Sequence, residues 1–366
     1  MLRSLLGLLV LSTLLSCEES LPCEKTPGNI CALIGTGELG YNRDGLAAQE
    51  SDLFLVSAIR PGPDGRTWVM DFNNQRLRVI EEDGVVQTVV GNGFHAFAEV
   101  GVAPEVSSLE NPIDFDFDSQ GRLIFVSYHD PRVLTIGDDG LLQKVAGQDD
   151  GVTAVDGNAG DGGPAVDAQF IQLDGIVIAP DDTIYVSDSL ANRVRVIRDG
   201  IIDTVAGSGE QGYSGDGGPG VDAALHWPTA LELDPEGNLY IAELRSHVVR
   251  KLAPDGTIST FAGTGQPGAG GDGGPATQAQ LDQPYGIALD DDGTMYIGDR
   301  GNFKIRKVTP DGTMETVAGT GREGLTGDGG PALSAELGFV ARVALDGDSL
   351  LIADQSNSVG RRLVLR

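Results

Sequence analysis

The stretch YGIALDDDGTMYIGDRGNFKIRKVTPDGTMETVAG at residues 285–319 decides the fold of this chain. It contains four short runs in which apolar and polar residues alternate, and the turns between them carry Asp-Asp-Gly at 291–293 and Pro-Asp-Gly at 310–312. Period-two alternation and Asp-Gly turns indicate short antiparallel strands. The stretch therefore predicts one four-stranded antiparallel unit.

The middle part of this unit recurs about every 56 residues, which is a period typical of propeller blades. The six copies read WVMDFNNQRLRVI (68–80), FVSYHDPRVLTIG (125–137), YVSDSLANRVRVI (185–197), YIAELRSHVVRKL (240–252), YIGDRGNFKIRKV (296–308) and LIADQSNSVGRRL (351–363). Aligned on sequence, their fourth positions hold Asp71, Tyr128, Asp188, Glu243, Asp299 and Asp354. The repeat predicts an all-β, six-bladed β-propeller over residues 28–366, built from four-stranded blades.

The two ends of the chain predict how the ring closes. The sixth copy ends at Arg366, directly after its third strand. The segment CALIGTG at 31–37 is similar to the fourth-strand segments ETVAGTG (315–321), STFAGTG (259–265) and DTVAGSG (203–209). We therefore expect the N-terminal strand to complete the last blade, which leaves no unpaired strand edge at the junction.

The repeat core has the form hydrophobic-Asp-x-x-Asn-x-Arg-hydrophobic-Arg. It is seen at Asp71, Asn74, Arg76 and Arg78, and again at Asp299, Asn302 and Arg306 and at Asp354, Asn357 and Arg361. In this core the chain resembles the NHL-repeat family of six-bladed propellers over nearly all of 28–366, and its Gly-Asp-Gly-Gly-Pro loops resemble those of bacterial NHL lipoproteins. The second copy departs from the pattern, with Tyr128 in place of Asp and Leu134 in place of the last Arg. The resemblance implies a binding platform, although related six-bladed propellers include lyases and lactonases.

Composition narrows the class of partner. The chain has 54 acidic and 25 basic residues, a net charge of −29, and 53 glycines. Such a charge disfavours binding to nucleic-acid phosphates and favours solubility outside the cell. We expect a monomer that binds a protein, a small molecule or a glycan, and no nucleic acid.

The N-terminus predicts export. Arg3 is followed by the apolar run LLGLLVLSTLL (5–15), which is too short to span a bilayer. The run ends in Leu-Leu-Ser-Cys at 14–17, which resembles a bacterial lipobox. Residues 1–16 are therefore expected to be a lipoprotein signal peptide, Cys17 the lipidated residue and 17–27 a polar tether. Because Glu rather than Asp follows Cys17, we expect the outer membrane, contacted only through the lipid.

Two further cysteines, Cys23 and Cys31, lie close together in the sequence. An exported compartment permits a disulfide between them, and the alternative is a pair of free thiols. A metal site made by two cysteines without a nearby histidine is disfavoured.

Long loops between the blades repeat a glycine-rich motif. They read GDGGPAVDAQF (160–170), GDGGPGVDAAL (215–225), GDGGPATQAQL (271–281) and GDGGPALSAEL (327–337), with a weaker copy at 43–53. Each predicts a glycine turn followed by one or two helical turns, with Pro164, Pro219, Pro275 and Pro331 at or near the first helical position. Asp161, Asp216, Asp272 and Asp328 are then expected to cap backbone N–H groups. The alternative is a ring of carboxylates, joined by Asp44, that binds calcium.

Residues that recur in every blade are expected to serve the scaffold. The Asp71–Arg78, Asp188–Arg195 and Asp299–Arg306 pairs recur at one offset, which indicates structural ion pairs. Residues unique to one blade are better candidates for function. Those expected to face the axis just before each innermost strand are Phe54, Asn111, Asp114, Gln172, Asp174, His226, Trp227, Asp282, Tyr285, Phe339 and Arg342. Aromatic residues among carboxylates suit a sugar, a peptide or an organic cation, and the alternative is that these side chains plug the channel.

Catalytic motifs are sparse. The four histidines, His95, His129, His226 and His247, fall in loops expected on one face, without a convergent spacing for zinc. No Gly-x-Ser-x-Gly motif occurs. We therefore predict a non-enzymatic lipoprotein platform without a cofactor, unless calcium binds. The alternative is a calcium- or zinc-dependent hydrolase or lyase that uses Asp114, Asp174 and His226 at the axial mouth.

Overall fold

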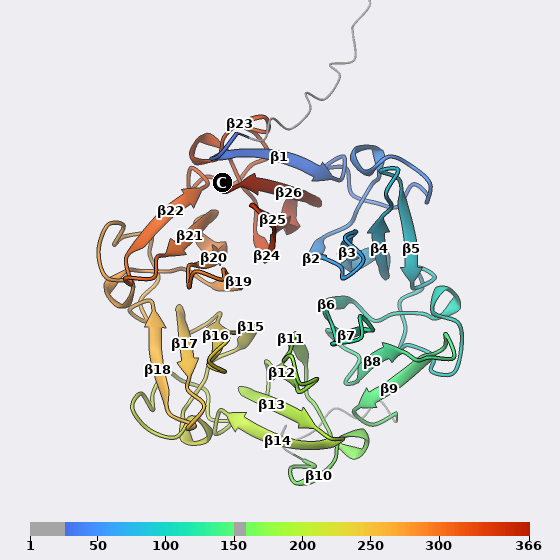
Figure 1. Ribbon diagram of the computed structural model, residues 1–366, viewed down its shortest axis with the longest axis horizontal. Coiled ribbons are helices and arrows are strands. Elements are labelled where there is room, and N and C mark those ends of the chain that lie inside the picture. The colour runs from blue at the N-terminus through green and yellow to red at the C-terminus, as the bar shows by residue number, and fades with distance from the viewer. Residues whose placement is uncertain (1–25, 150–158) are drawn as a thin grey trace, which may run out of the picture.

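The strands form six antiparallel sheets arranged as a ring around a central axis (Figure 1). The computed structural model describes residues 26–149 and 159–366, so the predicted signal peptide, Cys17, Cys23 and most of the tether lie outside the described residues. The predicted all-β, six-bladed β-propeller with four-stranded blades is confirmed.

Each blade runs from an innermost strand to an outermost one. Blade 1 has β2 (Val56–Pro61), β3 (Thr67–Asp71), β4 (Arg76–Ile80) and β5 (Val86–Val90). Blade 2 has β6 (Pro112–Phe117), β7 (Leu123–Ser127), β8 (Val133–Ile136) and β9 (Leu142–Ala146). Blade 3 has β11 (Leu173–Ile178), β12 (Ile184–Asp188), β13 (Arg193–Arg198) and β14 (Ile201–Ala206), with the two-residue strand β10 (Gly163–Pro164) outside.

The remaining blades follow the same order. Blade 4 has β15 (Pro228–Leu233), β16 (Leu239–Glu243), β17 (Val248–Leu252) and β18 (Ile258–Ala262). Blade 5 has β19 (Pro284–Leu289), β20 (Met295–Asp299), β21 (Lys304–Val308) and β22 (Met314–Ala318). Blade 6 has β24 (Val340–Asp346), β25 (Ser349–Asp354), β26 (Val359–Val364) and, from the other end of the chain, β1 (Asn29–Ile34).

The ring closes through β1, as the sequence predicted. This strand pairs antiparallel with β26, with Ile30 opposite Leu363 and Ala32 opposite Arg361. The short strand β23 (Gly330–Pro331) pairs with its outer edge. Ile30 and Ile34 are fully buried, so this strand fills part of the core as well as satisfying the edge of the sheet. Figure 1 shows the blue N-terminal strand beside the red C-terminal one.

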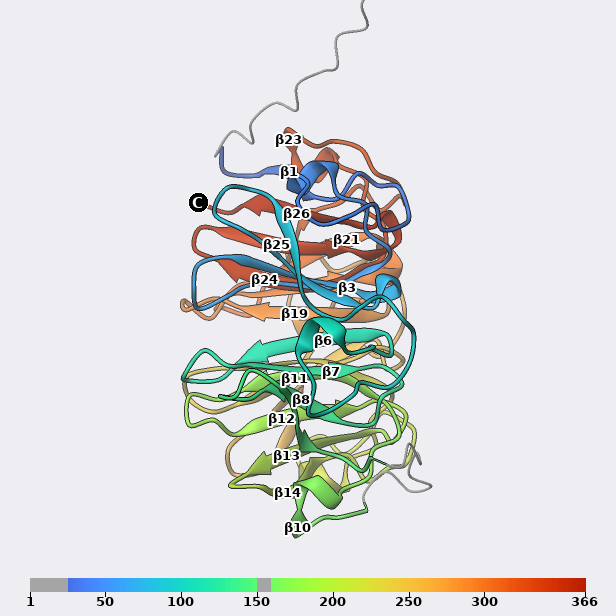
Figure 2. The same ribbon diagram turned by 90° about the vertical axis from the view of Figure 1, so that its right-hand side faces the viewer.

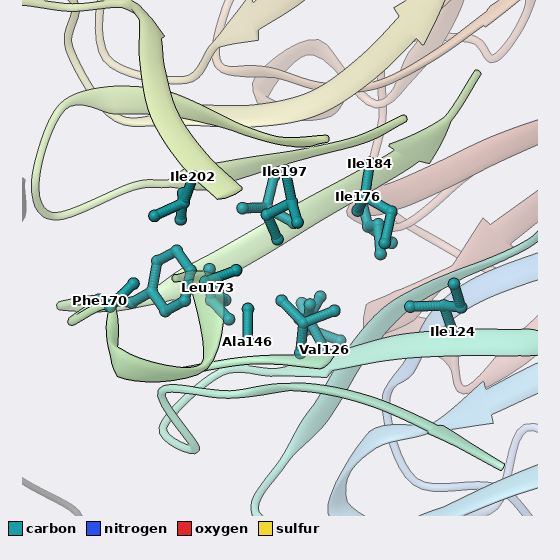
Figure 3. Close-up of a cluster of buried hydrophobic side chains, with 14 residues drawn as sticks. Ile124, Val126, Ala146, Phe170, Leu173, Ile176, Ile184, Ile197 and Ile202 are labelled. Carbon is teal, nitrogen blue, oxygen red and sulfur yellow. The ribbon is translucent and has the colours of Figure 1, made fainter. Parts of the chain in front are cut away.

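The hydrophobic core lies between neighbouring blades. Between blades 2 and 3, Val126 on β7 faces Ile176 on β11 and Ile184 on β12, and Phe170 closes the outer end (Figure 3). All four side chains are nearly or fully buried. With aromatic residues at only 5% of the chain, aliphatic side chains make up most of these interfaces.

The two faces of the ring differ in the length of their connections. One face, here called the loop face, carries the connections between blades and those from the second to the third strand. The other, the turn face, carries tight turns such as that at Gly293, whose φ of 86° explains the glycine. Seen edge-on, the strands run between these faces (Figure 2). Asn302 Nδ2 donates to Gly268 O at 2.7 Å and so joins the two kinds of connection on the loop face.

Nine short 3₁₀ helices occur among the described residues, all of three residues. Those before the innermost strands are η1 (Ala48–Glu50), η3 (Pro104–Val106), η4 (Ala165–Asp167), η5 (Gly220–Asp222), η6 (Ala276–Gln278) and η8 (Ala332–Ser334). Those after the second strands are η2 (Phe72–Asn74), η7 (Arg300–Asn302) and η9 (Gln355–Asn357). The prolines of the glycine-rich loops lie immediately before η4, η5, η6 and η8, close to the predicted position. A Cβ on Gly271 would lie 2.5 Å from the Cα of Ala279, so that turn requires glycine.

The predicted capping role of the loop aspartates was wrong. The helices that follow them have no side-chain capping hydrogen bond. In blade 5, Asp272 Oδ1 instead accepts from Arg306 Nη2 at 2.6 Å, and Asp272 Oδ2 accepts from Thr316 Oγ1 at 2.7 Å. The glycine turn places this carboxylate over the third and fourth strands, within hydrogen-bond distance of Arg306 and Thr316.

The same guanidinium also binds the repeat acid. Arg306 Nη1 lies 3.1 Å from Asp299 Oδ2, and both side chains are fully buried. This arrangement, an arginine between a buried acid and a loop aspartate, is here called the clamp. It recurs as Asp71–Arg78–Asp44, Glu243–Arg250–Asp216 and Asp354–Arg361–Asp328. In blade 3, Arg195 pairs with Asp161, and its charge also acts on Asp188. The predicted scaffold role of these pairs agrees with their burial.

Blade 2 has no clamp, and its alignment needs a correction. Pro112 at the start of β6 pairs with Ser127, as Val56 pairs with Asp71 in blade 1. The residue at the position of the repeat acid is therefore Ser127, and Tyr128 is one residue further on. The sequence comparison missed this shift because the spacing between blades varies. Leu134 does replace the clamp arginine, as predicted.

Cys31 is disulfide-bonded, and Cys23, its predicted partner, lies outside the described residues. Within residues 26–149 and 159–366, no helix has the length and hydrophobicity needed to cross a lipid bilayer.

Candidate functional site

The innermost strands carry side chains near the axis that differ from blade to blade. In every blade the pairing of the first two strands shifts register near the start of the innermost strand. Such a bulge re-aims the side chain that it carries. The side chains within or directly after these bulges include Asp174 in blade 3, Tyr285 in blade 5, Arg342 in blade 6 and, directly after the bulge residue Ile113, Asp114 in blade 2. The sequence predicted these four residues, and the structure brings them together.

These four residues form what is here called the axial cluster. Arg342 lies 3.1 Å from Asp114 Oδ2 through Nε and 3.2 Å from Asp174 Oδ1 through Nη2. Tyr285 Oη donates to Asp174 Oδ1 at 2.8 Å. All four are buried, with Asp174 fully inaccessible. One guanidinium thus joins three blades across the axis, which fits the alternative that these side chains plug the channel.

The cluster leaves one acceptor without a partner. Asp174 Oδ2 is buried and accepts no hydrogen bond among the described residues. Burial raises the pKa of Asp174, against the opposing charge of Arg342. Burial also raises the pKa of Tyr285 well above its usual range. An unsatisfied buried carboxylate oxygen is costly, and it marks a place where a donor from outside can gain.

The turn-face end of the axis holds a small charged pocket of about 190 Å³. Arg60, Asp116 and Glu232 line it, together with apolar residues of blades 5 and 6. Arg60 lies 3.7 Å from Asp116 and 3.6 Å from Asp114, so it continues the axial cluster toward this face. Burial raises the pKa of Glu232 to about 8. Burial therefore favours the neutral form of Glu232. The pocket is also too small for most organic ligands.

The loop-face end is lined differently. Arg300 lies over the rings of Tyr285, at 5.2 Å, and Phe339, at 4.7 Å. Arg245 lies 5.6 Å from the ring of Trp227. Neither guanidinium forms an ion pair within the described ranges, although the chain has twice as many acidic as basic residues. Two arginines stacked on rings without a carboxylate partner offer a positive spot on an acidic protein.

Tyr128 connects these arginines to the axial cluster. Its pKa is raised, first by burial and then by the charge of Asp174, whereas Gln172, Arg300 and Arg245 lower it. The charges of Asp174, Arg300 and Arg245 therefore all act on this phenol. The loop-face rim is defined here as Tyr128, Trp227, Arg245, Arg300 and Phe339.

Several predicted residues lie elsewhere on the loop face. His226 contacts Gln211, and Asp282 Oδ1 lies 3.2 Å from His247 Nδ1. Asn111 contacts His95, and Gln172 Nε2 donates to Ser189 Oγ at 3.0 Å. Phe54 donates its backbone N–H to Asp71. These side chains do not join the axial cluster.

Hydrogen bonds also link the blades near the rim. Trp227 N donates to Asn192 Oδ1 at 3.1 Å, and Gln283 N donates to His247 Nδ1 at 3.1 Å. All four residues have positive φ values, between 53° and 59°. Burial lowers the pKa of His247, opposed by Asp282. The acceptor of this hydrogen bond between blades is thus the side-chain amide of Asn192 in one case and the imidazole of His247 in the other.

Sequence reasoning missed Arg245 and Arg300. Arg300 follows the repeat acid directly, at the position of Phe72, Ser189, Leu244 and Gln355 in other blades. The difference between blades at this position was the available signal. This position follows the second strand, outside the segments before the innermost strands from which the candidate residues came.

One group of metal-ligating side chains occurs in the described part of the chain: His95, Glu110 and His129. Their ligand atoms lie within 4.8 Å of one another. All three belong to the loop face of blade 2. The aspartates proposed from sequence as calcium ligands are instead engaged by clamp arginines, and that proposal has no further support among these contacts.

Comparison with known proteins places this geometry in a family. The family model that describes the teneurin NHL domain matches residues 44–263 and 264–328. The chain belongs to the NHL-domain family. It therefore has the repeat that its sequence suggested, and the match covers the strands of blades 1 to 5 but none of the four strands of blade 6.

Relatives of this NHL domain are much longer proteins. Teneurin-m of Drosophila melanogaster is 28% identical over 343 residues, which is 86% of this chain and 12% of the relative. The chain spans between 10% and 23% of the length of the curated relatives that it matches.

Solved structures share the fold of this NHL domain. An auxiliary nutrient binding protein from Bacteroides thetaiotaomicron aligns with a TM-score of 0.65 and 16% identity, over 91% of this chain and 75% of that one. A gluconolactonase from Xanthomonas campestris aligns with a TM-score of 0.55 and 15% identity, over 86% and 87%. Identities this low establish the propeller and nothing about the ligand.

Proposed function

We propose that this NHL domain is an exported binding platform that takes a small, hydroxylated acidic ligand, such as an acidic sugar, at the loop-face rim. One observation carries the proposal: Arg300 and Arg245 lack ion-pair partners in the described chain and stack on the rings of Phe339 and Trp227. A carboxylate on the ligand would satisfy the arginines.

The surroundings suit such a ligand. Trp227, Phe339 and Tyr128 supply ring surfaces around the polar groups, a composition typical of sugar sites. The rings also hold the guanidiniums in place, so less side-chain entropy is lost when a ligand binds. The axial cluster beneath is buried and ion-paired, which gives the rim a rigid base.

The protein's location belongs to the same proposal. The lipobox-like Cys17 would anchor the chain in the bacterial envelope, with the outer membrane favoured by the residues that follow it. The disulfide at Cys31 fits an oxidising compartment. One solved propeller of similar fold is an auxiliary nutrient binding protein, which is consistent with a binding role. Replacing Cys17→Ala should abolish incorporation of labelled palmitate and release the chain from membranes, and unchanged labelling would refute the anchor.

A metal-dependent hydrolase or lyase at the axial mouth has less support. Such a site needs carboxylates or histidines free to bind a cation. Asp114 and Asp174 both contact Arg342, which competes with a cation for their oxygens. His226 contacts Gln211 instead of the axial carboxylates.

The test compares two sugars that differ in one group. Glucuronate and glucose would be titrated calorimetrically into the soluble chain that begins after Cys17. We expect glucuronate to bind more tightly, because only it offers a carboxylate to the rim. Arg300→Gln should weaken glucuronate binding about tenfold, which corresponds to the loss of one charged hydrogen bond.

Arg322→Gln is the matched control, because Arg322 is exposed on another loop. It should leave binding unchanged. The proposal is refuted if glucuronate does not bind, if glucose binds equally well, or if the Arg300 variant keeps the wild-type affinity.

A further inference from the structure

We infer that blade 2 carries a binding site for one transition-metal ion, of which zinc is the expected one, formed by His95, Glu110 and His129 on the loop face. The site lies apart from the axial cluster and goes beyond the ligand site proposed above. It rests on the convergence of three side chains from three separate segments.

The convergence is close. His95 Nε2 lies 2.8 Å from Glu110 Oε1, and His129 Nδ1 lies 3.5 Å from the same oxygen. A tetrahedral zinc ion with bonds of about 2.0–2.2 Å holds its ligand atoms about 3.4 Å apart. Small side-chain rotations would therefore create the required geometry.

A fourth possible ligand atom, Asn111 Oδ1, faces His95 Nε2. Asn111 Oδ1 lies 2.8 Å from His95 Nε2, and Asn111 Nδ2 lies 3.2 Å from Asn73 Oδ1. One imidazole nitrogen thus faces two oxygen acceptors, Glu110 Oε1 and Asn111 Oδ1. A single N–H proton cannot serve both well, whereas a cation can attract all of these atoms.

The three positions that hold His95, Glu110 and His129 in blade 2 have equivalents in the other blades, where other residues occupy them. In blade 4 the three equivalent positions hold Gln211, His226 and Arg245, and in blade 6 they hold Glu323, Gly338 and Ser356. In blade 1 they hold Leu39, Phe54 and Asn73, and in blade 5 Pro267, Asp282 and Gly301. Among the blades described at all three positions, blade 2 alone has three metal-ligating residue types there.

The ligand set selects the metal. Two imidazoles and a carboxylate suit zinc and neighbouring transition metals, whereas calcium prefers a shell of oxygens. The His95 and His129 side chains are 56% and 54% exposed, so solvent or another ligand can reach the ion. Three protein ligands with an open position are typical of an accessible zinc site.

The site is also adjacent to the rim. The ring of Tyr128 lies 4.9 Å from that of His129, edge to face. An ion held at blade 2 would therefore fix the orientation of the loop that contributes Tyr128. Tyr128, one of the residues by which blade 2 differs from the other blades, therefore borders the proposed metal site.

The test uses the untagged soluble chain, stripped with chelator and then dialysed. Zinc would be titrated against a chromophoric competitor, and Co²⁺ would be added separately as a spectroscopic probe. We expect one equivalent of zinc and the intense visible bands of four-coordinate cobalt. His129→Ala and His95→Ala should each weaken zinc binding by about 100-fold and remove the cobalt bands.

His226→Ala is the matched control, because it removes a loop-face histidine at the position that Glu110 occupies in blade 2. It should bind zinc like the wild type. The His variants should fold, since both histidines are half exposed, and circular dichroism would check this. The inference is overturned if no stoichiometric zinc binds, if the cobalt spectrum is that of six-coordinate ions, or if His129→Ala and His226→Ala bind zinc equally.

Discussion

Blades 5 and 2 solve the same packing problem in different ways. In blade 5, Arg306 is fully buried between Asp299 and Asp272. In blade 2, the equivalents of Asp299 and Arg306 are Ser127 and Leu134, so the acid and the arginine are missing together.

Blade 2 instead has an ion pair two positions nearer the loop. Arg132 Nη2 lies 2.7 Å from Asp130 Oδ2, and both side chains are nearly inaccessible. The same arginine donates to Ala98 O at 2.8 Å, which ties it to the connection from blade 1. The clamp is therefore a unit that is kept or lost whole, because a buried charge without its partner is costly. The blade that lacks the clamp is also the one that carries the His95–Glu110–His129 cluster.

The largest loss of stability is expected when ring closure is removed. Blades can be compared by their clamps only while the ring is closed. Deleting residues 29–34 removes β1, exposes the edge of β26 and uncovers the core around Ile30 and Ile34. We expect loss of cooperative thermal unfolding, measured by calorimetry. A deletion variant with the wild-type melting temperature would show that the ring does not depend on this strand.

The next effect tests the clamp directly. Arg306→Ala leaves Asp299 buried without a guanidinium and should lower the free energy of unfolding by about 3–5 kcal/mol. Urea unfolding would measure it. Arg322→Ala, an exposed arginine, is the control and should change stability by no more than about 0.5 kcal/mol. A loss below about 1 kcal/mol for Arg306→Ala would mean that the clamp is not a stabilising unit.

A graft of the blade 2 residues sharpens the comparison. Arg306→Leu alone should be strongly destabilising, because it leaves the Asp299 carboxylate buried without its ion-pair partner. The double variant Asp299→Ser, Arg306→Leu reproduces the residues of blade 2 and should be more stable than Arg306→Leu alone by at least about 1 kcal/mol. Additive losses in a double-mutant cycle would contradict the view that the clamp is lost as a unit.

The smallest effect concerns pH and the links between blades. His247 accepts from Gln283 N through an unprotonated Nδ1, and burial holds its folded pKa below the ordinary value of about 6.5. With the folded pKa depressed, this stabilisation is present above pH 6.5 and is lost as pH falls through the folded pKa.

The chain supplies its own control for this link, since Asn192 makes the same bond to Trp227. His247→Asn should keep the wild-type stability at pH 7.5 to within about 1 kcal/mol and lose less of it between pH 7 and pH 5. Chemical unfolding at several pH values would measure this. Parallel pH profiles for the two proteins would exclude His247 as the titrating group.

Much of the scaffold could be predicted because its signals are local and repeated. The alternating runs and Asp-Gly turns of 285–319 became β19 to β22. The similarity of 31–37 to the fourth-strand segments gave the closure by β1. The repeated Asp–Arg offset indicated the buried pairs. Asp114, Asp174, Tyr285 and Arg342 were predicted because each differs from its counterparts in other blades.

The failures concern contacts between segments far apart in the chain. The helix-capping prediction for Asp272 considered only the helix next to it, whereas the guanidinium that binds it is on a strand 34 residues later. Ser127 was hidden by the uneven length of the connection before it. His95 and His129 are not spaced like zinc ligands in the sequence.

By itself, the sequence determined the blade, the number of blades and the closure of the ring, because alternation, turn chemistry and period act over a few residues at a time. Only the tertiary structure decided which charges meet. The ring places Arg342 of blade 6 against Asp114 of blade 2 and Asp174 of blade 3, and it leaves Arg300 and Arg245 without carboxylates in the described chain. The closure of the ring decides which side chains meet across the axis. The spacing of residues along the chain does not reveal these contacts.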